Sequence, residues 1–143
     1  MERKHWKTLL FTGYCLLMLW LLLGQRMDDG CVRDLQLRPL RTLQLFWNAL
    51  TNSKNPGMRF HAVINLLGNV VMFVPLGFLI PWIWQPWRRF LRHLGLMIGI
   101  ILCVELSQYA LCLGTCDVDD LLLNLIGTTI GFVLWKLCSR FLK

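Results

Sequence analysis

Strongly polar side chains interrupt three stretches of this sequence that are otherwise apolar. Asn65 and Asn69 are four residues apart, so they share one face of a helix. Glu105 and Gln108, three residues apart, share a face as well. A longer series later in the chain falls on one stripe at helical spacing: Asp117, Asp120, Asn124 and Thr128. Carboxylates in such an arrangement could bind a divalent metal ion or act as general acid and base, and the amides could orient a polar head group.

The composition indicates that a lipid bilayer surrounds the helices that carry these side chains. The chain is long enough for a single domain (residues 1–143), and 56% of its residues are hydrophobic against 16% charged. The apolar residues form blocks separated by short charged segments, a pattern typical of membrane-spanning helices. The basic residues, which give a net charge of +7, lie at the ends of these blocks. They favour contact with anionic lipid head groups, and no module typical of nucleic-acid binding is present.

Four apolar blocks are long enough to cross a membrane as helices, at residues of about 8–24, 60–84, 93–113 and 118–138. A cleavable signal peptide is the alternative for the first block, but the block is long and no small-residue cleavage site follows it. The polar segment 25–59 contains a short amphipathic helix that begins near Pro39. The expected fold class is all-α, a polytopic membrane protein with four transmembrane helices and a short interfacial amphipathic helix.

The distribution of basic residues predicts the orientation in a bacterial cytoplasmic membrane. The N-terminus, the loop 85–93 and the C-terminus each carry three Lys or Arg residues, whereas the loop before the fourth span carries none. Because positive charge is retained on the cytoplasmic side, both termini are expected in the cytoplasm and the segment 25–59 outside. The six basic residues of that segment oppose this orientation and are partly balanced by its three acidic residues.

With this orientation, the polar side chains of three spans lie at one depth, just beneath the outer surface. The amide pair of the second span and the Glu105 pair of the third both fall in the outer half of their helices. The fourth span begins outside, so its acidic residues fall in its first turns. A carboxylate within a span is unfavourable by roughly 2.5–3.5 kcal/mol, so Glu105 is expected to face the bundle and to be paired, protonated or bound to a metal. The three helices thus predict a polar pocket that opens to the outer leaflet.

Each of these polar residues also has a purely structural interpretation. The amides could serve only as interhelical hydrogen-bonding groups, and Glu105 could belong to a buried structural pair. Asp119 and Asp120 could cap a helix, since acidic residues near a helix N-terminus are favourable there. We prefer this capping interpretation for Asp119, which lies off the polar stripe. Gly127 and Gly131 have the spacing that lets a second helix approach closely.

The six cysteines match no zinc-binding spacing. Most of them lie in or beside apolar blocks, where Cys behaves as a small hydrophobic residue. Cys31 and Cys116 could both face outward and form a disulfide bond, although nothing in the sequence fixes the distance between them.

Three segments of the chain resemble, in order, three motifs of the VanZ-like family of membrane proteins. Asn69–Gly77 resembles the family's N-x-x-x-F-x-P-x-G motif, and Glu105–Gln108 resembles its E-x-x-Q motif. Asp117–Gly127 resembles its D-x-x-D-x-x-x-N-x-x-G motif. The order and the spacing of the motifs agree from about residue 61 to 137. Each motif is short, but all three occur in order on three expected helices.

The sequence departs from the family pattern at one position. Family members commonly carry Arg three residues before the first Asp of the third motif, whereas this chain has Gly114 there. If that Arg pairs with a carboxylate or a phosphate, another residue of this chain must supply the positive charge. Arg59 and His61 are the candidates at the right depth.

Our leading hypothesis is a membrane protein whose polar pocket binds or acts on a cell-envelope lipid or a peptidoglycan precursor. The namesake of the family confers low-level resistance to the glycopeptide teicoplanin, whereas many relatives have no resistance role. With the resemblance and the polar pattern taken together, the candidate catalytic residues are Glu105, Asp117 and Asp120. The candidate ligand-binding residues are Asn65, Asn69, Gln108, Asn124, His61 and Arg59.

Two other functions are open for the same residues. The protein could be an enzyme whose carboxylates act on a lipid-linked substrate, by acid-base chemistry or through a divalent metal ion, which these residues allow but do not require. No Ser-His or Cys-His arrangement favours covalent catalysis. Alternatively, the protein could be a non-catalytic subunit of an assembly or an oligomer, in which the polar residues only join helices.

Overall fold

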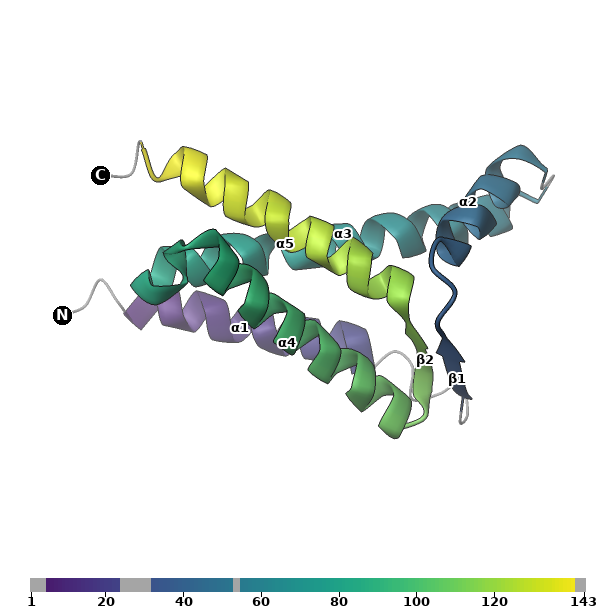
Figure 1. Ribbon diagram of the computed structural model, residues 1–143, viewed down its shortest axis with the longest axis horizontal. Coiled ribbons are helices and arrows are strands. Elements are labelled where there is room, and N and C mark those ends of the chain that lie inside the picture. Colours follow the sequence, from purple (N-terminus) through teal and green to yellow (C-terminus); the bar gives the residue numbers. More distant parts are fainter. Residues whose placement is uncertain (1–4, 24–31, 53–54, 141–143) are drawn as a thin grey trace.

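The computed structural model describes residues 5–23, 32–52 and 55–140, and four long helices dominate it (Figure 1). These helices are α1 (His5–Leu23), α3 (Pro56–Ile83), α4 (Phe90–Ala110) and α5 (Val118–Cys138). Each is long and apolar enough to cross a membrane, which confirms the predicted class of a four-span helical protein. The first three begin three or four residues earlier than the sequence predicts, and α5 coincides with its predicted range. A 3-10 helix, η3 (Gln85–Arg88), joins α3 to α4.

A short helix, α2 (Arg41–Thr51), forms where the sequence predicts an amphipathic helix. It begins directly after Pro39 and Leu40, and Leu40 adopts a left-handed backbone conformation with a φ of 66°. No side chain of α2 itself caps its first turn, and that turn contains no acidic residue. The free N–H groups at the start of α2 must therefore find acceptors elsewhere in the protein.

Two strands of five residues, which the sequence did not predict, precede α2 and α5 and pair with each other. These strands are β1 (Val32–Gln36) and β2 (Leu113–Asp117). They pair in parallel, with Val32 opposite Leu113 and Gln36 opposite Asp117. Because β1 leads into α2 and β2 leads into α5, the pair brings the starts of these two helices to the same end of the bundle (Figure 1). We call this end the strand end.

Helices α3 and α5 pack with their backbones in contact, as the spacing of Gly127 and Gly131 predicts. A Cβ atom at Gly131 would lie 2.0 Å from the carbonyl oxygen of Val74. A Cβ atom at Gly127 would lie 2.2 Å from the carbonyl oxygen of Val70. Only glycine at these two positions allows this approach, so the pair fixes the position of the polar stripe of α5 relative to α3.

The apolar core joins α1, α3 and α4. Its buried members come from these three helices: Met18, Phe73, Leu76, Ile80, Met97 and Ile101. The hydroxyl of Tyr14 on α1 donates a hydrogen bond to the backbone carbonyl of Met72 on α3. The polar residues of α4 and α5 thus lie against a packed apolar layer that holds their helices in place.

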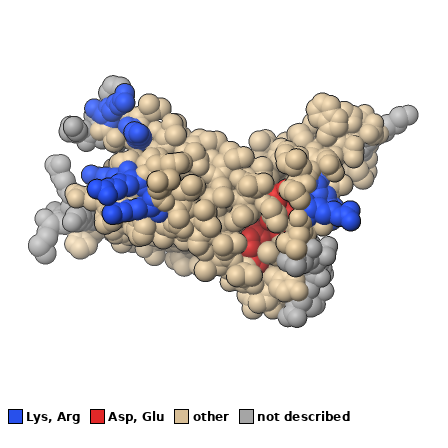
Figure 2. Space-filling model, viewed as in Figure 1, with Lys and Arg blue, Asp and Glu red and all other residues tan. Residues whose placement is uncertain are grey.

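Charged residues are unevenly distributed between the two ends of the bundle, and a smaller group of basic residues also lies at the end that carries the acidic ones (Figure 2). Lys and Arg gather mainly at the end where both termini lie, which we call the basic end, and Asp and Glu appear near β2 at the strand end. At the basic end, the ammonium group of Lys7 lies 4.2 Å from the centroid of the Trp82 ring. The guanidinium group of Arg88 lies 5.8 Å from the centroid of the Trp135 ring. Tryptophan rings beside basic groups are typical of a membrane–water interface.

Candidate functional site

Asn69 and Asp120, from two of the predicted motifs, form a hydrogen bond between α3 and α5. The side-chain amide of Asn69 donates to Oδ1 of Asp120 at 2.5 Å. Both residues lie in the half of their helix near the strand end, and both are partly buried. The close contact of α3 and α5 at Gly127 brings the two side chains within reach, because Asp120 lies about two turns before that glycine.

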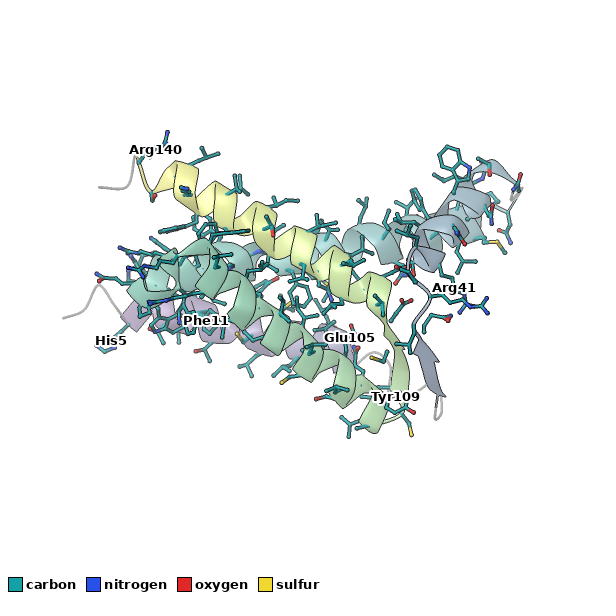
Figure 3. The ribbon with its side chains drawn as sticks, in the orientation of Figure 1. His5, Phe11, Arg41, Glu105, Tyr109 and Arg140 are labelled. Atoms are coloured by element: carbon teal, nitrogen blue, oxygen red, sulfur yellow. The ribbon has the colours of Figure 1, made fainter. Side chains whose placement is uncertain are left out.

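Glu105 lies on the side of α4 that faces α5 and β2, where it approaches the start of α5 (Figure 3). Its side chain is only 4% exposed. Its Oε2 accepts a hydrogen bond from the backbone N–H of Asp117 at 3.4 Å. The third span and the fourth therefore meet at the two positions that the sequence selects for carboxylate chemistry.

Asp117 connects β2, α2 and α5. It is the N-cap of α5, where its Oδ1 accepts from the backbone N–H of Asp119 at 2.9 Å. Its Oδ2 accepts from the hydroxyl of Thr42 on α2 at 3.2 Å. Together with the bond to Glu105, these contacts connect Asp117 to α2, α4 and α5. We use the name carboxylate cluster for the four acidic residues at this end of α4 and α5: Glu105, Asp117, Asp119 and Asp120.

Asp119 caps a helix, but the helix is α2 rather than its own. Its Oδ1 accepts from the backbone N–H of Leu40 at 2.6 Å, and its Oδ2 accepts from the backbone N–H of Thr42 at 2.7 Å. The side chain is 3% exposed. Spacing along α5 could not show this role, because the partner lies in a distant segment. The absence of a cap within α2 was the only signal of it in the sequence.

Asn124 and Thr128 continue the polar stripe of α5 into the interior of the bundle. Asn124 is 3% exposed, and its Oδ1 has no hydrogen-bond partner among the described residues. The hydroxyl of Thr128 lies 3.3 Å from Nε2 of His93 on α4. His93 is fully buried and stacks near Phe132, with 5.0 Å between ring centroids. Sequence reasoning missed His93, which it placed at the beginning of a span and gave no role.

Gln108 joins α4 to α1. Its side-chain amide donates to the backbone carbonyl of Leu22 at 2.9 Å, and the side chain is 2% exposed. Leu22 lies in the last turn of α1, where backbone carbonyls lack a partner within the helix. This bond corresponds to the structural interpretation of Gln108, since it attaches α1 to α4.

Asn65 lines a groove between α2 and α3, with a volume of about 610 Å³. We call it the amide groove. Two further Asn side chains, Asn48 and Asn52, line it from α2, and the rest of its wall is largely apolar. Thr42 also lines the groove, and the same hydroxyl that bonds to Asp117 connects the groove to the carboxylate cluster.

Arg59 and His61 both lie near the start of α3. The side chain of Arg59 is exposed. The side chain of His61 lies outside the part that the structure describes. The sequence-based proposal that either one replaces the missing Arg of the third motif therefore stays a prediction.

Within the described residues, no three His, Cys, Asp or Glu side chains are grouped so that they could hold a metal ion. The disulfide bond between Cys31 and Cys116, which the sequence leaves open, does not form, because Cys116 is a free thiol. Cys112, four residues earlier and at the turn after α4, is disulfide-bonded instead. Burial raises the pKa of the Cys116 thiol, and the negative charges of Glu105 and Asp117 raise it further.

No curated protein and no solved structure matches the chain. The VanZ/LLP1 family model matches residues 9–139, which is nearly the whole chain and includes all three motifs. This match confirms the resemblance that the motifs indicate. With four helices suited to span a bilayer, the chain is a membrane protein that belongs to the VanZ/LLP1 family.

Proposed function

We propose that the protein binds the head group of a cell-envelope lipid or of a lipid-linked peptidoglycan precursor at its strand end. In this proposal the strand end faces the outside of a bacterial cytoplasmic membrane, and both termini are cytoplasmic. The observation that carries it is the amide groove, which lies directly beside the carboxylate cluster. Binding of a peptidoglycan precursor would also account for an effect on glycopeptide susceptibility.

The uneven distribution of basic residues supports the proposed orientation. Basic residues gather at the end with the termini, which is expected of the cytoplasmic side (Figure 2). The disulfide bond of Cys112 supports the same orientation, because such bonds persist in oxidising compartments outside the cytoplasm. Cys112 follows the end of α4 that leads into β2, and therefore lies at the strand end.

We expect Phe90→Cys in a cysteine-free protein to resist a membrane-impermeant maleimide applied to intact cells. Leu50→Cys on α2 should be labelled under the same conditions, since α2 lies at the opposite end of the bundle. Both side chains are exposed on the protein surface. A difference in labelling therefore reports on which side of the membrane each position lies. Circular dichroism of the cysteine-free protein controls for the loss of the Cys112 disulfide bond. Labelling of position 90 from outside would reverse the orientation.

The chemistry of the amide groove favours a neutral, hydroxyl-rich or amide-rich head group. None of the described residues that line the groove carries a formal charge. Its Asn side chains each offer donors and an acceptor, which suits sugar hydroxyls and N-acyl groups. Apolar side chains such as Phe46 and Met58 supply a surface for the less polar faces of a sugar ring. The carboxylates behind Thr42 could then accept hydrogen bonds from a donor that reaches the end of the groove.

Asn65→Leu should weaken the binding of a fluorescent lipid-linked peptidoglycan precursor in nanodiscs by about tenfold, as expected for the loss of hydrogen bonds in the groove. Gln44→Leu is the matched control. It also replaces an exposed amide with Leu, but Gln44 lies on α2 outside the groove lining. The control should bind with the affinity of the parent protein. Equal affinity in both variants would exclude the amide groove as the binding site.

A non-catalytic role in assembly is the second candidate. Two observations favour it: Gln108 and Asp119 use their side chains to join elements of this chain rather than to face a groove. If this role is the whole function, the polar cluster stabilises the fold and binds no head group. The enzyme alternative uses the same carboxylates as the main proposal. Conversion of the precursor to a product would distinguish an enzyme from a protein that only binds the precursor.

A further inference from the structure

A second groove lies between α2 and α5 and has a volume of about 440 Å³. We call it the apolar groove. It shares no lining residue with the amide groove. Leu40 and Leu43 line it from the α2 side, and α5 supplies the other wall with seven residues: Asp119, Leu122, Leu123, Leu125, Ile126, Thr129 and Ile130.

The two polar side chains in this lining have already used their hydrogen-bonding groups. Both carboxylate oxygens of Asp119 accept backbone N–H groups of α2. The hydroxyl of Thr129 donates to the backbone carbonyl of Leu125 at 2.7 Å. The groove therefore offers an occupant contact with hydrocarbon and little hydrogen bonding, which fits an alkyl chain and excludes a sugar or a peptide backbone.

The length of the apolar groove matches one leaflet of a membrane. Its α5 wall extends from Asp119 to Ile130, which are eleven helical steps apart, or about 16 Å at the helical rise. Half of a hydrocarbon core of about 30 Å is about 15 Å. Since Asp119 is in the first turn of α5 and Ile130 is near its middle, the groove extends from the strand end to the centre of the bilayer.

Positive charge lies at the outer end of the apolar groove. Arg38 and Arg41 flank Leu40 in the chain, and both are exposed. Figure 3 shows Arg41 projecting away from α2 at the strand end. The backbone N–H groups of Leu40 and Thr42 are occupied by Asp119, and the two guanidinium groups offer charged donors to an anion at this end.

We infer that the apolar groove binds one acyl chain of an anionic phospholipid of the bilayer, with the phosphate beside Arg38 and Arg41. Guanidinium groups attract anionic head groups at a membrane surface, and the apolar lining takes the chain. A lipid in this position fills the space between α2 and α5. This site does not depend on head-group binding in the amide groove, because the two grooves border α2 with different residues and have no lining residue in common.

Native mass spectrometry of the full-length protein, released from detergent with added phosphatidylglycerol, tests this site. Ile126→Trp fills the groove from α5 and should lower the fraction of protein that retains phosphatidylglycerol by about tenfold. Val133→Trp is the matched control on the same helix. Ile126 is 51% exposed and Val133 is 47% exposed, but Val133 lies outside the groove. The control should retain the lipid as the parent protein does.

Two further variants distinguish binding of the acyl chain from binding of the phosphate. Leu43→Trp fills the groove from α2 and should act like Ile126→Trp, so the test does not depend on one variant folding. Arg41→Gln should lower the retention of phosphatidylglycerol by about fivefold and leave that of zwitterionic phosphatidylcholine unchanged. Equal retention of phosphatidylglycerol in both groove-filling variants and the control would overturn the site. Loss of a second protein copy instead of lipid would also overturn it, by identifying the groove as an interface between copies.

Discussion

Glu105→Gln is expected to fold and insert like the parent protein while binding of the lipid-linked precursor falls by roughly 10–100-fold. The side chain is 4% exposed, and burying a charge in a span is unfavourable, so the neutral amide should be tolerated. The amide oxygen can still accept the N–H of Asp117, which is a long bond of 3.4 Å in the parent. The lost contribution is that of a charged acceptor to the ligand, about 1.5–3 kcal/mol. Thermal unfolding in detergent and nanodisc titration measure the two effects separately.

Asp120→Asn should behave in the same way. Its amide oxygen can keep the hydrogen bond from Asn69, so α3 and α5 stay joined while the charge is lost. If both variants are stable and bind as tightly as the parent protein, the carboxylates have no chemical role, and the assembly function becomes the better explanation. If the parent protein converts the precursor and Glu105→Gln binds it without conversion, the protein is an enzyme.

Asp119→Asn provides the contrast. Spacing alone places Asp119 off the polar stripe, and from the sequence its substitution would be expected to be silent. In the structure its two oxygens accept two backbone N–H groups of α2, and an Asn side chain can accept only one of them. The unpaired N–H should lower the free energy of unfolding by about 1–3 kcal/mol. Binding should weaken together with stability, because α2 forms one wall of the amide groove.

The spans and the polar stripes could be predicted because both depend on local periodicity. Four apolar blocks of sufficient length identify the membrane-spanning helices without any knowledge of which helices pack against one another. The contact between Asn69 and Asp120 also follows from the sequence, because each falls on a stripe that must avoid lipid. Cysteine pairing does not follow in this way, and the suggested partner of Cys31, Cys116, is a free thiol.

Contacts between segments that have no periodic pattern could not be predicted. The strands β1 and β2 are five residues each and pair across about eighty residues of sequence, so no alternation of apolar and polar residues identifies them. The hydrogen bonds from α2 to Asp119 depend on that pairing, because it brings the starts of α2 and α5 to one end. The burial of His93 depends in turn on the approach of Thr128, which is set by the packing of α5.

Gly131→Ala should destabilise the protein strongly, although it adds only one methyl group. The added Cβ would lie 2.0 Å from the Val74 carbonyl oxygen and 2.9 Å from the Cα atom of Gly77. These are backbone atoms that cannot rotate away, so α3 and α5 must move apart. Overpacking of this kind typically lowers the free energy of unfolding by about 1–3 kcal/mol, and rigid backbone contacts place this variant at the upper end. Thermal unfolding in detergent measures the loss.

Gly95→Ala and Gly99→Ala are the matched controls for Gly131→Ala, because both add the same methyl group to a glycine within a membrane-spanning helix. Nothing lies within 4 Å of a Cβ atom at either position. Alanine favours the helix over glycine by about 1 kcal/mol, so these variants should be as stable as the parent protein or more stable.

Gly131→Ala should also weaken precursor binding, because separating α3 from α5 breaks the bond between Asn69 and Asp120. That joint loss of stability and binding distinguishes it from Glu105→Gln, in which binding alone is expected to fall. If Gly131→Ala proves as stable as Gly95→Ala, the close approach of α3 and α5 is wrong, and the polar cluster that depends on it must be arranged differently.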